Sequence, residues 1–212
     1  MSTKTKAKKE QKKDKTIKSL KSVTNFVALD LGCGQNKITV ENMVQQMNVT
    51  IDKVIGVDFA ECPGVDIVHD LTVFPYPFED ESVDAIFSSH FAEHLDGFER
   101  AKFMDECWRI LKPDGRMRLI HPYYKSVRAV QDFTHKWPPI SENSYLYWDR
   151  NWRKINGLTH GPYELKCDYE FNVYYTWQDQ VWANKNEETR NFAVNHYFNV
   201  VADMIVDLKK RP

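Results

Sequence analysis

The sequence predicts an α/β protein with a doubly wound, mostly parallel sheet of seven strands and an antiparallel strand at its C-terminal edge. Two patterns support this fold class. In the first half, short apolar runs that end near an acid alternate with segments of helical periodicity, and near the C-terminus two segments alternate apolar and polar residues. The length of 212 residues suits one domain with a sizeable core.

The first elements are expected to be a strand, a helix and a second strand. Residues 26–30 are apolar up to a terminal aspartate and are followed by Gly-Cys-Gly, which predicts a buried strand that ends in a sharp turn. Residues 39–48 place apolar side chains at helical spacing, and residues 53–58 form a second apolar run that ends in an acid. This order predicts two parallel strands joined by a crossover helix.

The next elements continue the alternation. Strands are predicted at residues 65–70 and 84–89, with a proline-broken loop between them. A helix is expected over residues 98–111, because apolar positions recur at helical spacing until Lys-Pro-Asp-Gly stops it. It leads into a strand at residues 117–120.

Two alternating segments near the C-terminus, residues 170–177 and 198–208, predict the remaining strands, because period two is typical of a strand. We expect the last strand to be antiparallel to its neighbour and to lie at the far edge of the sheet.

The composition favours a soluble protein. Hydrophobic residues make up 42% and charged residues 28%, close to globular averages, and no apolar run is long enough to cross a bilayer. The first residues lack the apolar stretch of a secretory signal, so a cytoplasmic location is expected. The four cysteines form no C-x-x-C pair, which predicts reduced thiols rather than disulfides or a thiolate zinc site.

The N-terminal segment differs from the rest in charge. Residues 1–21 contain nine lysines but only Glu10 and Asp14 as acids. Such a run could attract nucleic acid or an anionic surface, but a solvated, disordered tail is the commoner meaning. We therefore expect a disordered tail at 1–21 and one domain at 22–212.

The turn after the first strand disfavours a dinucleotide ligand. It follows Asp30 and lacks the third glycine of G-x-G-x-x-G. A pyrophosphate would be repelled by an acid there, whereas a cationic ligand would tolerate it. Asp58, at the end of the second strand, occupies the position from which an acid commonly binds ribose hydroxyls.

Six sequence blocks follow one another between residues 26 and 122. They are D-L-G-C-G-x-x-K, V-I-G-V-D, V-D-I-V-H-D-L, F-P-Y-P-F-E-D-E-S-V-D, S-S-H-F-A-E-H-L and I-L-K-P-D-G. In this order and spacing they resemble the class I S-adenosylmethionine-dependent methyltransferases, in particular small bacterial and phage-type members. The resemblance implies a Rossmann-like sheet and S-adenosyl-L-methionine as cofactor, with no metal ligand.

The resemblance also implies roles for individual residues. Asp58 would bind the ribose hydroxyls, Asp70 would accept from the adenine amino group, and the glycine loop would pass close to the methionine moiety. The complete set expected at the cofactor is Asp30, Gly32, Cys33, Gly34, Lys37, Asp58, Phe59, Asp70, Leu71, Ser89 and His90.

An aromatic-rich insertion is expected at about 123–165. Residues 123–163 hold nine aromatic residues in 41 positions. Aromatic residues in such a segment more often pack in the core than bind a ligand. Its place after the fifth strand nevertheless predicts that it forms a partial lid, which would cover an acceptor site. Methyl transfer needs a general base only when the acceptor arrives protonated. The candidates for this role are His90, His121 and His135.

The acceptor is expected to be a small molecule methylated at O or N. The fourth strand is not followed by the N-P-P-Y or D-P-P-Y of base-methylating enzymes, and no cysteine follows a proline, so a nucleic-acid substrate is disfavoured. Oligomeric state stays open.

Two alternatives remain at this point. One is a non-catalytic partner subunit that binds the cofactor without turnover. The other is a zinc hydrolase, because the string H-x-x-E-H formed by His90, Glu93 and His94 also marks inverted zinc peptidases, where a helix presents both imidazoles to the metal.

Overall fold

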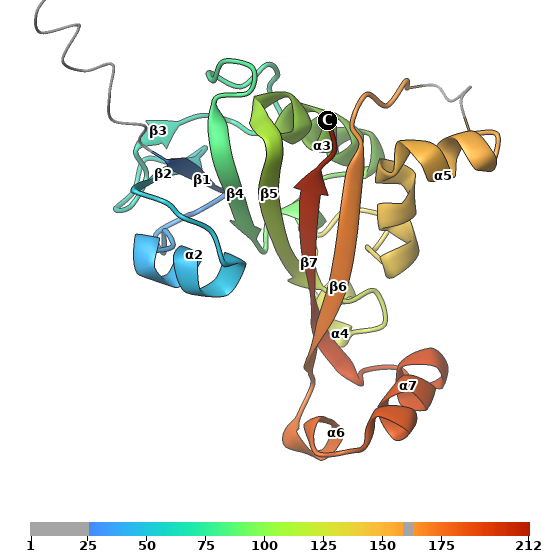
Figure 1. The fold of residues 1–212 in the computed structure, drawn as a ribbon. Helices are drawn as coiled ribbons and strands as arrows, with labels where there is room; N and C mark the ends of the chain where they lie inside the picture. Colours follow the sequence, from blue (N-terminus) through green and yellow to red (C-terminus); the bar gives the residue numbers. More distant parts are fainter. Residues whose placement is uncertain (1–25, 159–162) are drawn as a thin grey trace, which may run out of the picture.

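The computed structural model describes residues 26–158 and 163–212, and the predicted tail at 1–21 lies outside this part (Figure 1). Seven strands form one sheet: β1 Val27–Leu31, β2 Lys53–Asp58, β3 Ile67–Val68, β4 Val83–Ser89, β5 Leu111–Pro122, β6 Tyr169–Trp177 and β7 Val201–Lys210. Their order is β3-β2-β1-β4-β5-β7-β6, and β1 to β5 pair in parallel. The predicted α/β class with seven strands is confirmed.

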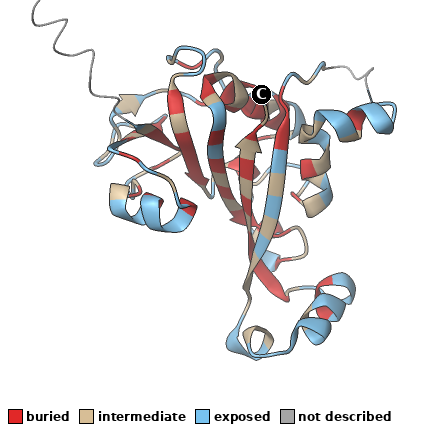
Figure 2. Cartoon of the chain, viewed as in Figure 1, coloured by how far each residue is buried: buried red, intermediate tan, exposed pale blue. Residues whose placement is uncertain are grey.

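The last strand is antiparallel, as predicted, but its expected place at the edge of the sheet was wrong. β7 lies between β5 and β6 and is antiparallel to both, so β6 forms the edge. Burial explains the arrangement, because most β7 residues are buried whereas β6 alternates between covered and exposed positions (Figure 2). Both strands have the same period-two pattern, so this pattern could not decide which one lies outside.

The helices are short, and most begin at a polar cap. They are α2 Val40–Met47, α3 Gly97–Ile110, α4 Val127–Val130, α5 Arg150–Ile155, α6 Gln180–Ala183 and α7 Glu187–His196, with 3₁₀ turns η2 at Ala92–His94 and η3 at Glu142–Trp148. Asp96 caps α3 in a capping box with Glu99, and Thr39 caps α2. No helix in the described part of the chain combines the length and apolarity needed to cross a membrane.

The sheet separates two hydrophobic cores. On one face, Met43 and Met47 of α2 pack with Ala28, Ala85 and Phe87 from β1 and β4. The opposite face carries the larger core, to which α3, η3 and the alternate residues of β1, β4, β5, β6 and β7 contribute. The central strands are therefore covered on both sides (Figure 2).

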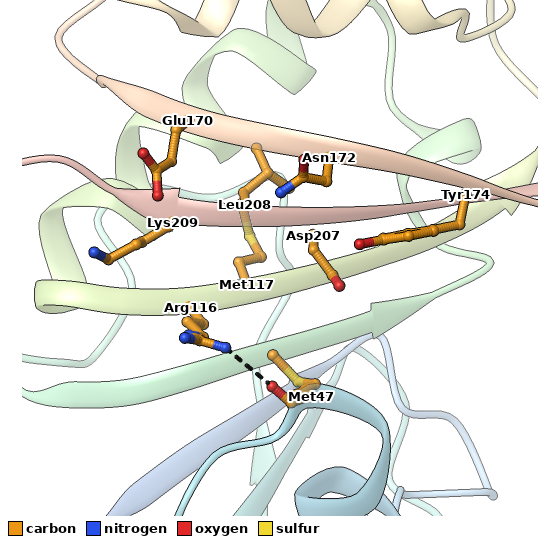
Figure 3. A pocket seen from close by; sticks show the side chains of 9 residues that line it. All are labelled: Met47, Arg116, Met117, Glu170, Asn172, Tyr174, Asp207, Leu208 and Lys209. Atoms are coloured by element: carbon orange, nitrogen blue, oxygen red, sulfur yellow. Dashed lines mark hydrogen bonds between the residues drawn. The ribbon is translucent and has the colours of Figure 1, made fainter.

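The face that carries α2 is polar over β5, β7 and β6. A hollow of about 210 Å³ there is lined by Met47, Arg116, Met117, Glu170, Asn172, Tyr174, Asp207, Leu208 and Lys209 (Figure 3). Arg118 forms a two-pronged ion pair with Asp207, at 2.5 and 2.6 Å. Arg116 pairs in the sheet with Ala85, near the start of β4, so the hollow lies away from the carboxyl ends of the parallel strands.

Candidate cofactor and acceptor site

The carboxyl ends of three neighbouring strands meet at one edge of the sheet. β1 pairs with β2 on one side and with β4 on the other, so the segments that follow these strands lie next to one another (Figure 1). These segments carry most of the residues predicted to bind the cofactor. This edge is where open parallel sheets bind their ligands.

Asp58 fastens the glycine loop to the end of β2. Its Oδ2 accepts a hydrogen bond from the backbone N–H of Gly34 at 2.9 Å, and its Oδ1 accepts from Ala60 N at 3.1 Å. The loop is also held by Gly32, whose N–H donates to Val57 O at 2.8 Å. Because each carboxylate oxygen accepts one backbone hydrogen bond, lone pairs remain on both for a ligand.

The two glycines of the loop are needed for different reasons. Gly32 has φ +74°, and a Cβ there would lie 2.7 Å from the Cβ of Phe91, so the glycine makes room for a protein side chain. Gly34 has φ +50°, and no atom lies within 4 Å of the position that its Cβ would take. The open space of the loop is therefore above Gly34.

Asp30 is the most buried acid of the site. It is 3% exposed, and its Oδ2 accepts from the N–H of Ile38 at 2.7 Å. Burial raises the pKa of Asp30 to about 6, partly offset by that hydrogen bond. A cation bound beside this carboxyl group would favour its ionised form.

The side chains of Lys37 and Cys33 are directed to structural partners. Lys37 Nζ forms an ion pair with Asp66 Oδ2 at 2.7 Å, and Asp66 also accepts from the N–H of Gly56. A Cβ on Gly56 would lie 2.9 Å from Cys33 Sγ and 2.7 Å from Lys37 Cδ, so these two side chains occupy the space beside Gly56. Burial raises the pKa of the Cys33 thiol to about 12. Both side chains thus have partners within the protein, and their role at the cofactor stays a prediction.

The segment after β3 brings Asp70 towards Asp58. His69 N donates to Asp58 O at 2.8 Å, so the ends of β2 and β3 are joined. Asp70 Oδ1 accepts from both the backbone and the hydroxyl of Thr72, which lowers the pKa of Asp70. Leu71 is buried, with its carbonyl bonded to the hydroxyl of Tyr76.

Phe59 directly follows Asp58 and is 75% exposed, so its ring is free to cover a ligand.

His90 follows Ser89 at the end of β4 and faces an acid. It has φ +55°, and its N–H donates to Ile120 O at 2.8 Å. His90 Nδ1 lies 3.2 Å from Glu93 Oε1, and this hydrogen bond raises the pKa of His90. Burial opposes ionisation of Glu93, yet the bond from His90 helps to keep the pKa of Glu93 below its usual value. His90 and Glu93 therefore form a coupled pair beside the glycine loop.

The structure removes His121 from the candidate bases. His121 is fully buried in β5, and both ring nitrogens are occupied: Nε2 lies 2.7 Å from Tyr145 Oη, and Nδ1 lies 3.0 Å from Pro122 O. Burial lowers the pKa of His121. Because the Nδ1 proton is directed to Pro122 O and Nε2 is paired with Tyr145 Oη, neither ring nitrogen is free to take a proton from an acceptor.

The H-x-x-E-H string does not form the helix that a zinc peptidase would need. His90 lies outside any helix, η2 covers only Ala92–His94, and α3 begins at Gly97. The two histidines are therefore not on one α-helical face. His94 instead packs edge-on against the ring of His135, with ring centres 5.0 Å apart.

Only part of the predicted insertion lies at the strand ends. α4 lies near the carboxyl ends of the sheet, whereas α5 lies far from them (Figure 1). Tyr145 of η3 is buried in the large core. α6 and α7, which the sequence patterns did not reveal, also lie beyond the strand ends (Figure 1).

The sequence patterns also did not reveal a charged pair of residues next to His90. Arg128 of α4 forms an ion pair with Asp203 of β7 at 2.9 Å, and both residues act on the pKa of His90. Oδ1 of Asp203 is buried without a hydrogen-bond partner among the described residues. These residues come together only through the antiparallel pairing of β5 and β7, so no local signal could have identified them.

The chain has recognisable relatives. Residues 29–119 match the family model described as methyltransferase domain. A probable S-adenosylmethionine-dependent methyltransferase of Mycolicibacterium smegmatis is 38% identical over 73 residues, which are 30% of this chain and 27% of the relative. The chloroplastic tocopherol O-methyltransferase of Arabidopsis thaliana is 28% identical over 109 residues, 48% of this chain and 31% of the relative. The matches thus span less than a third of these relatives.

A solved structure shares the fold over almost its whole length. The crystal structure of a SAM-dependent methyltransferase from Archaeoglobus fulgidus superimposes with a TM-score of 0.60 at 18% identity, covering 95% of this chain and 94% of the other. The seven-stranded sheet with its antiparallel β7 defines a Rossmann-like fold that is typical of class I methyltransferases. Residues 29–119 match a methyltransferase domain, and the resemblance to the class I S-adenosylmethionine-dependent methyltransferases that the sequence predicted is confirmed.

The site residues fit the cofactor of this family. The open space above Gly34 leaves room at the loop, and Asp58 keeps free acceptor capacity for two hydroxyls. Asp30 supplies a buried carboxyl group on the side where a cationic ligand is expected. The chemistry of the donor set is therefore consistent with an adenosyl sulfonium.

Proposed function

We propose that this chain binds S-adenosyl-L-methionine at the ends of β1, β2 and β4 and transfers its methyl group to O or N of a small-molecule acceptor. The observation that carries the proposal is the bond between Asp58 and Gly34, which shapes the loop and leaves the acid able to bind hydroxyls. In this site Asp58 binds the ribose, Asp70 and Phe59 contact the adenine, and Asp30 lies towards the charged end.

The protein's own contribution is positioning. The bound cofactor supplies an activated methyl group on a sulfonium. The chain has to hold the acceptor atom in line with that group and keep water away from it. His90 lies at the end of β4 beside the loop, so its ring would face the acceptor.

His90 is the candidate general base, and Glu93 is its positioning residue. The hydrogen bond from His90 Nδ1 to Glu93 Oε1 fixes the ring and favours its protonated form. A hydroxyl acceptor would lose its proton to the other ring nitrogen, Nε2. The ion pair of Arg128 and Asp203 next to it provides polar contacts for such an acceptor.

The small-molecule class is supported by one relative. The matched Arabidopsis protein is described as a tocopherol O-methyltransferase, which names a small acceptor and oxygen as the methylated atom.

A labelling experiment tests the proposal. The purified chain is incubated with methyl-labelled cofactor and with extracts of its source cells, separated into small molecules, proteins and nucleic acids. We expect label in the small-molecule fraction with wild type, and at limiting cofactor concentration much less label with Asp58→Asn. Cofactor binding without transfer to any fraction would instead favour the non-catalytic partner subunit, and label in a macromolecular fraction would contradict the acceptor class.

A further inference from the structure

A cluster of possible metal ligands lies next to the cofactor loop. One ligand atom from each of Glu93, His94 and His135 lies within 4.8 Å of the other two. Glu93 and His94 belong to η2, whereas His135 follows α4 in a distant part of the sequence. The fold, rather than the H-x-x-E-H string, brings the three together.

Glu93 has an oxygen that lacks a partner. The residue is only 7% exposed, and its Oε1 is bonded to His90. Its Oε2 is buried and has no hydrogen-bond partner within the described residues. An unpaired carboxylate oxygen in the interior is costly, and a bound cation would supply the missing interaction.

The hydrogen bonds of His94 place its ring proton on Nδ1, so that the lone pair of Nε2 is available to bind a metal. Thr134 donates its hydroxyl proton to Asp132 Oδ1 at 2.7 Å, so Thr134 Oγ1 acts as acceptor for the His94 Nδ1–H at 3.1 Å. A neutral imidazole carries one proton. With that proton on Nδ1, the lone pair of His94 lies on Nε2.

His135 is oriented in the same way. Its Nδ1 lies 3.3 Å from the carbonyl oxygen of Ala129, which fixes the ring proton on Nδ1. Its Nε2 is 3.9 Å from Asp132 Oδ2, beyond hydrogen-bond distance. Histidines that bind metals usually donate their other N–H to a carbonyl or to a group backed by a carboxylate, as both histidines do here.

We propose that Glu93, His94 and His135 together bind one divalent transition-metal ion, with Zn²⁺ as the reference ion. Two imidazoles and one carboxylate form the donor set of catalytic zinc sites, which leave a further position open. Zinc bonds of about 2.0–2.2 Å require the three atoms to move closer. The two histidines are only partly buried, so their side chains have room to do so.

The family resemblance implied no metal ligand, and the zinc-hydrolase alternative placed the metal on His90, Glu93 and His94. His90 instead orients Glu93, and His135 takes its place as a ligand. Phe91, next to the turn that carries Glu93 and His94, lies against Gly32 of the cofactor loop, so the cluster is close to that loop, and an ion held there by three protein ligands would keep a further position open. This position suits an oxygen of the methyl acceptor, and this role alone rests on the proposed function.

Metal binding is tested on the tag-free full chain after treatment with a chelator, without cofactor. Zn²⁺ is titrated by calorimetry, and Co²⁺ by its visible absorption, which reports the coordination geometry of the bound ion. We expect one ion per chain. Glu93→Gln and His135→Asn should each weaken binding at least tenfold, whereas His196→Asn, which changes an exposed histidine at the end of α7, should leave it unchanged.

Circular dichroism of each variant establishes that the fold is intact. Absence of stoichiometric binding by wild type, or equal affinity of wild type and the His94→Asn, His135→Asn double variant, would overturn the proposal. A metal that binds while S-adenosylmethionine does not would leave the metal site standing and refute the proposed function instead.

Discussion

Gly34 donates its backbone N–H to Asp58 Oδ2 at 2.9 Å, and this bond joins the loop after β1 to the end of β2. The acid that is expected to bind the ribose therefore also determines the shape of the loop that receives the cofactor. Asparagine at position 58 keeps an acceptor oxygen but loses the charge, so the two roles can be separated.

Replacing Asp58 should impair cofactor binding. We expect Asp58→Asn to weaken S-adenosylmethionine affinity at least tenfold, because it removes a charged acceptor, and Asp58→Ala to weaken it further because the loop is also released. Lys209→Met is the matched control, since it breaks only the exposed ion pair of this β7 residue with Asp114, away from the carboxyl ends of the parallel strands. Isothermal calorimetry measures all three, and equal affinities of wild type and Asp58→Ala would contradict the site.

The two loop glycines should respond differently to alanine. Gly32→Ala would force a Cβ to within 2.7 Å of Phe91, so it should lower the free energy of unfolding more than Gly34→Ala does. Gly34→Ala should instead reduce cofactor affinity, because its methyl group enters the open space above the loop. Urea unfolding and calorimetry give the two quantities, and the reverse order of effects would show that the ligand lies elsewhere.

Asp30 should make stability depend on pH. Its folded pKa of about 6 lies above the usual 3.8, so between these values the folded state binds more protons and stability falls as pH rises. Asp30→Asn should therefore raise the free energy of unfolding at pH 8 by about 3 kcal/mol, with no gain below pH 3. Urea unfolding over this pH range checks the trend, and a constant difference would be inconsistent with a raised pKa.

The His90 imidazole should titrate above its ordinary pKa because of Glu93. In Glu93→Gln the hydrogen bond loses its charge, so the pKa of His90 should fall. Nuclear magnetic resonance titration of the chelator-treated protein measures this, with His196 as an internal reference. If His90 is the base, the acid limb of the methylation rate should move to lower pH in this variant. An unchanged pKa would mean that the pair does not form.

His121 should matter for stability alone. Tyr145→Phe removes the hydroxyl that pairs with His121 Nε2 in the core, which should cost about 1–3 kcal/mol of unfolding free energy. The affinity for S-adenosylmethionine should stay that of wild type, since both side chains are buried and bonded to each other. A selective loss of binding without loss of stability would restore His121 to the site.

The parts of the site predicted from the sequence are those encoded locally. Asp30 and Asp58 lie at the ends of the apolar strands β1 and β2, and the glycine loop directly follows β1. Parallel pairing places such strand ends together whatever the rest of the fold does. The order of the strands near the C-terminus was harder to predict, because β6 and β7 share one alternation pattern. Only their burial in the folded protein shows which of the two lies between other strands of the sheet.

The direction of side chains and the contacts between distant parts of the chain could not be predicted from the sequence. His121 and Pro122 end a strand just as Ser89 and His90 do, yet one imidazole points into the core and the other lies at the end of the sheet. The approach of His135 to His94 depends on the path of the chain after α4, which no spacing in the sequence reveals. Lys37 matched a motif position, but its partner Asp66 lies in the loop before β3.

The most direct test is a crystal structure of the chain grown with S-adenosylhomocysteine. The ribose hydroxyls should lie within hydrogen-bond distance of Asp58, with the amino-acid portion crossing above Gly34. Ligand density at any other place, with this edge of the sheet filled only by solvent, would contradict the account.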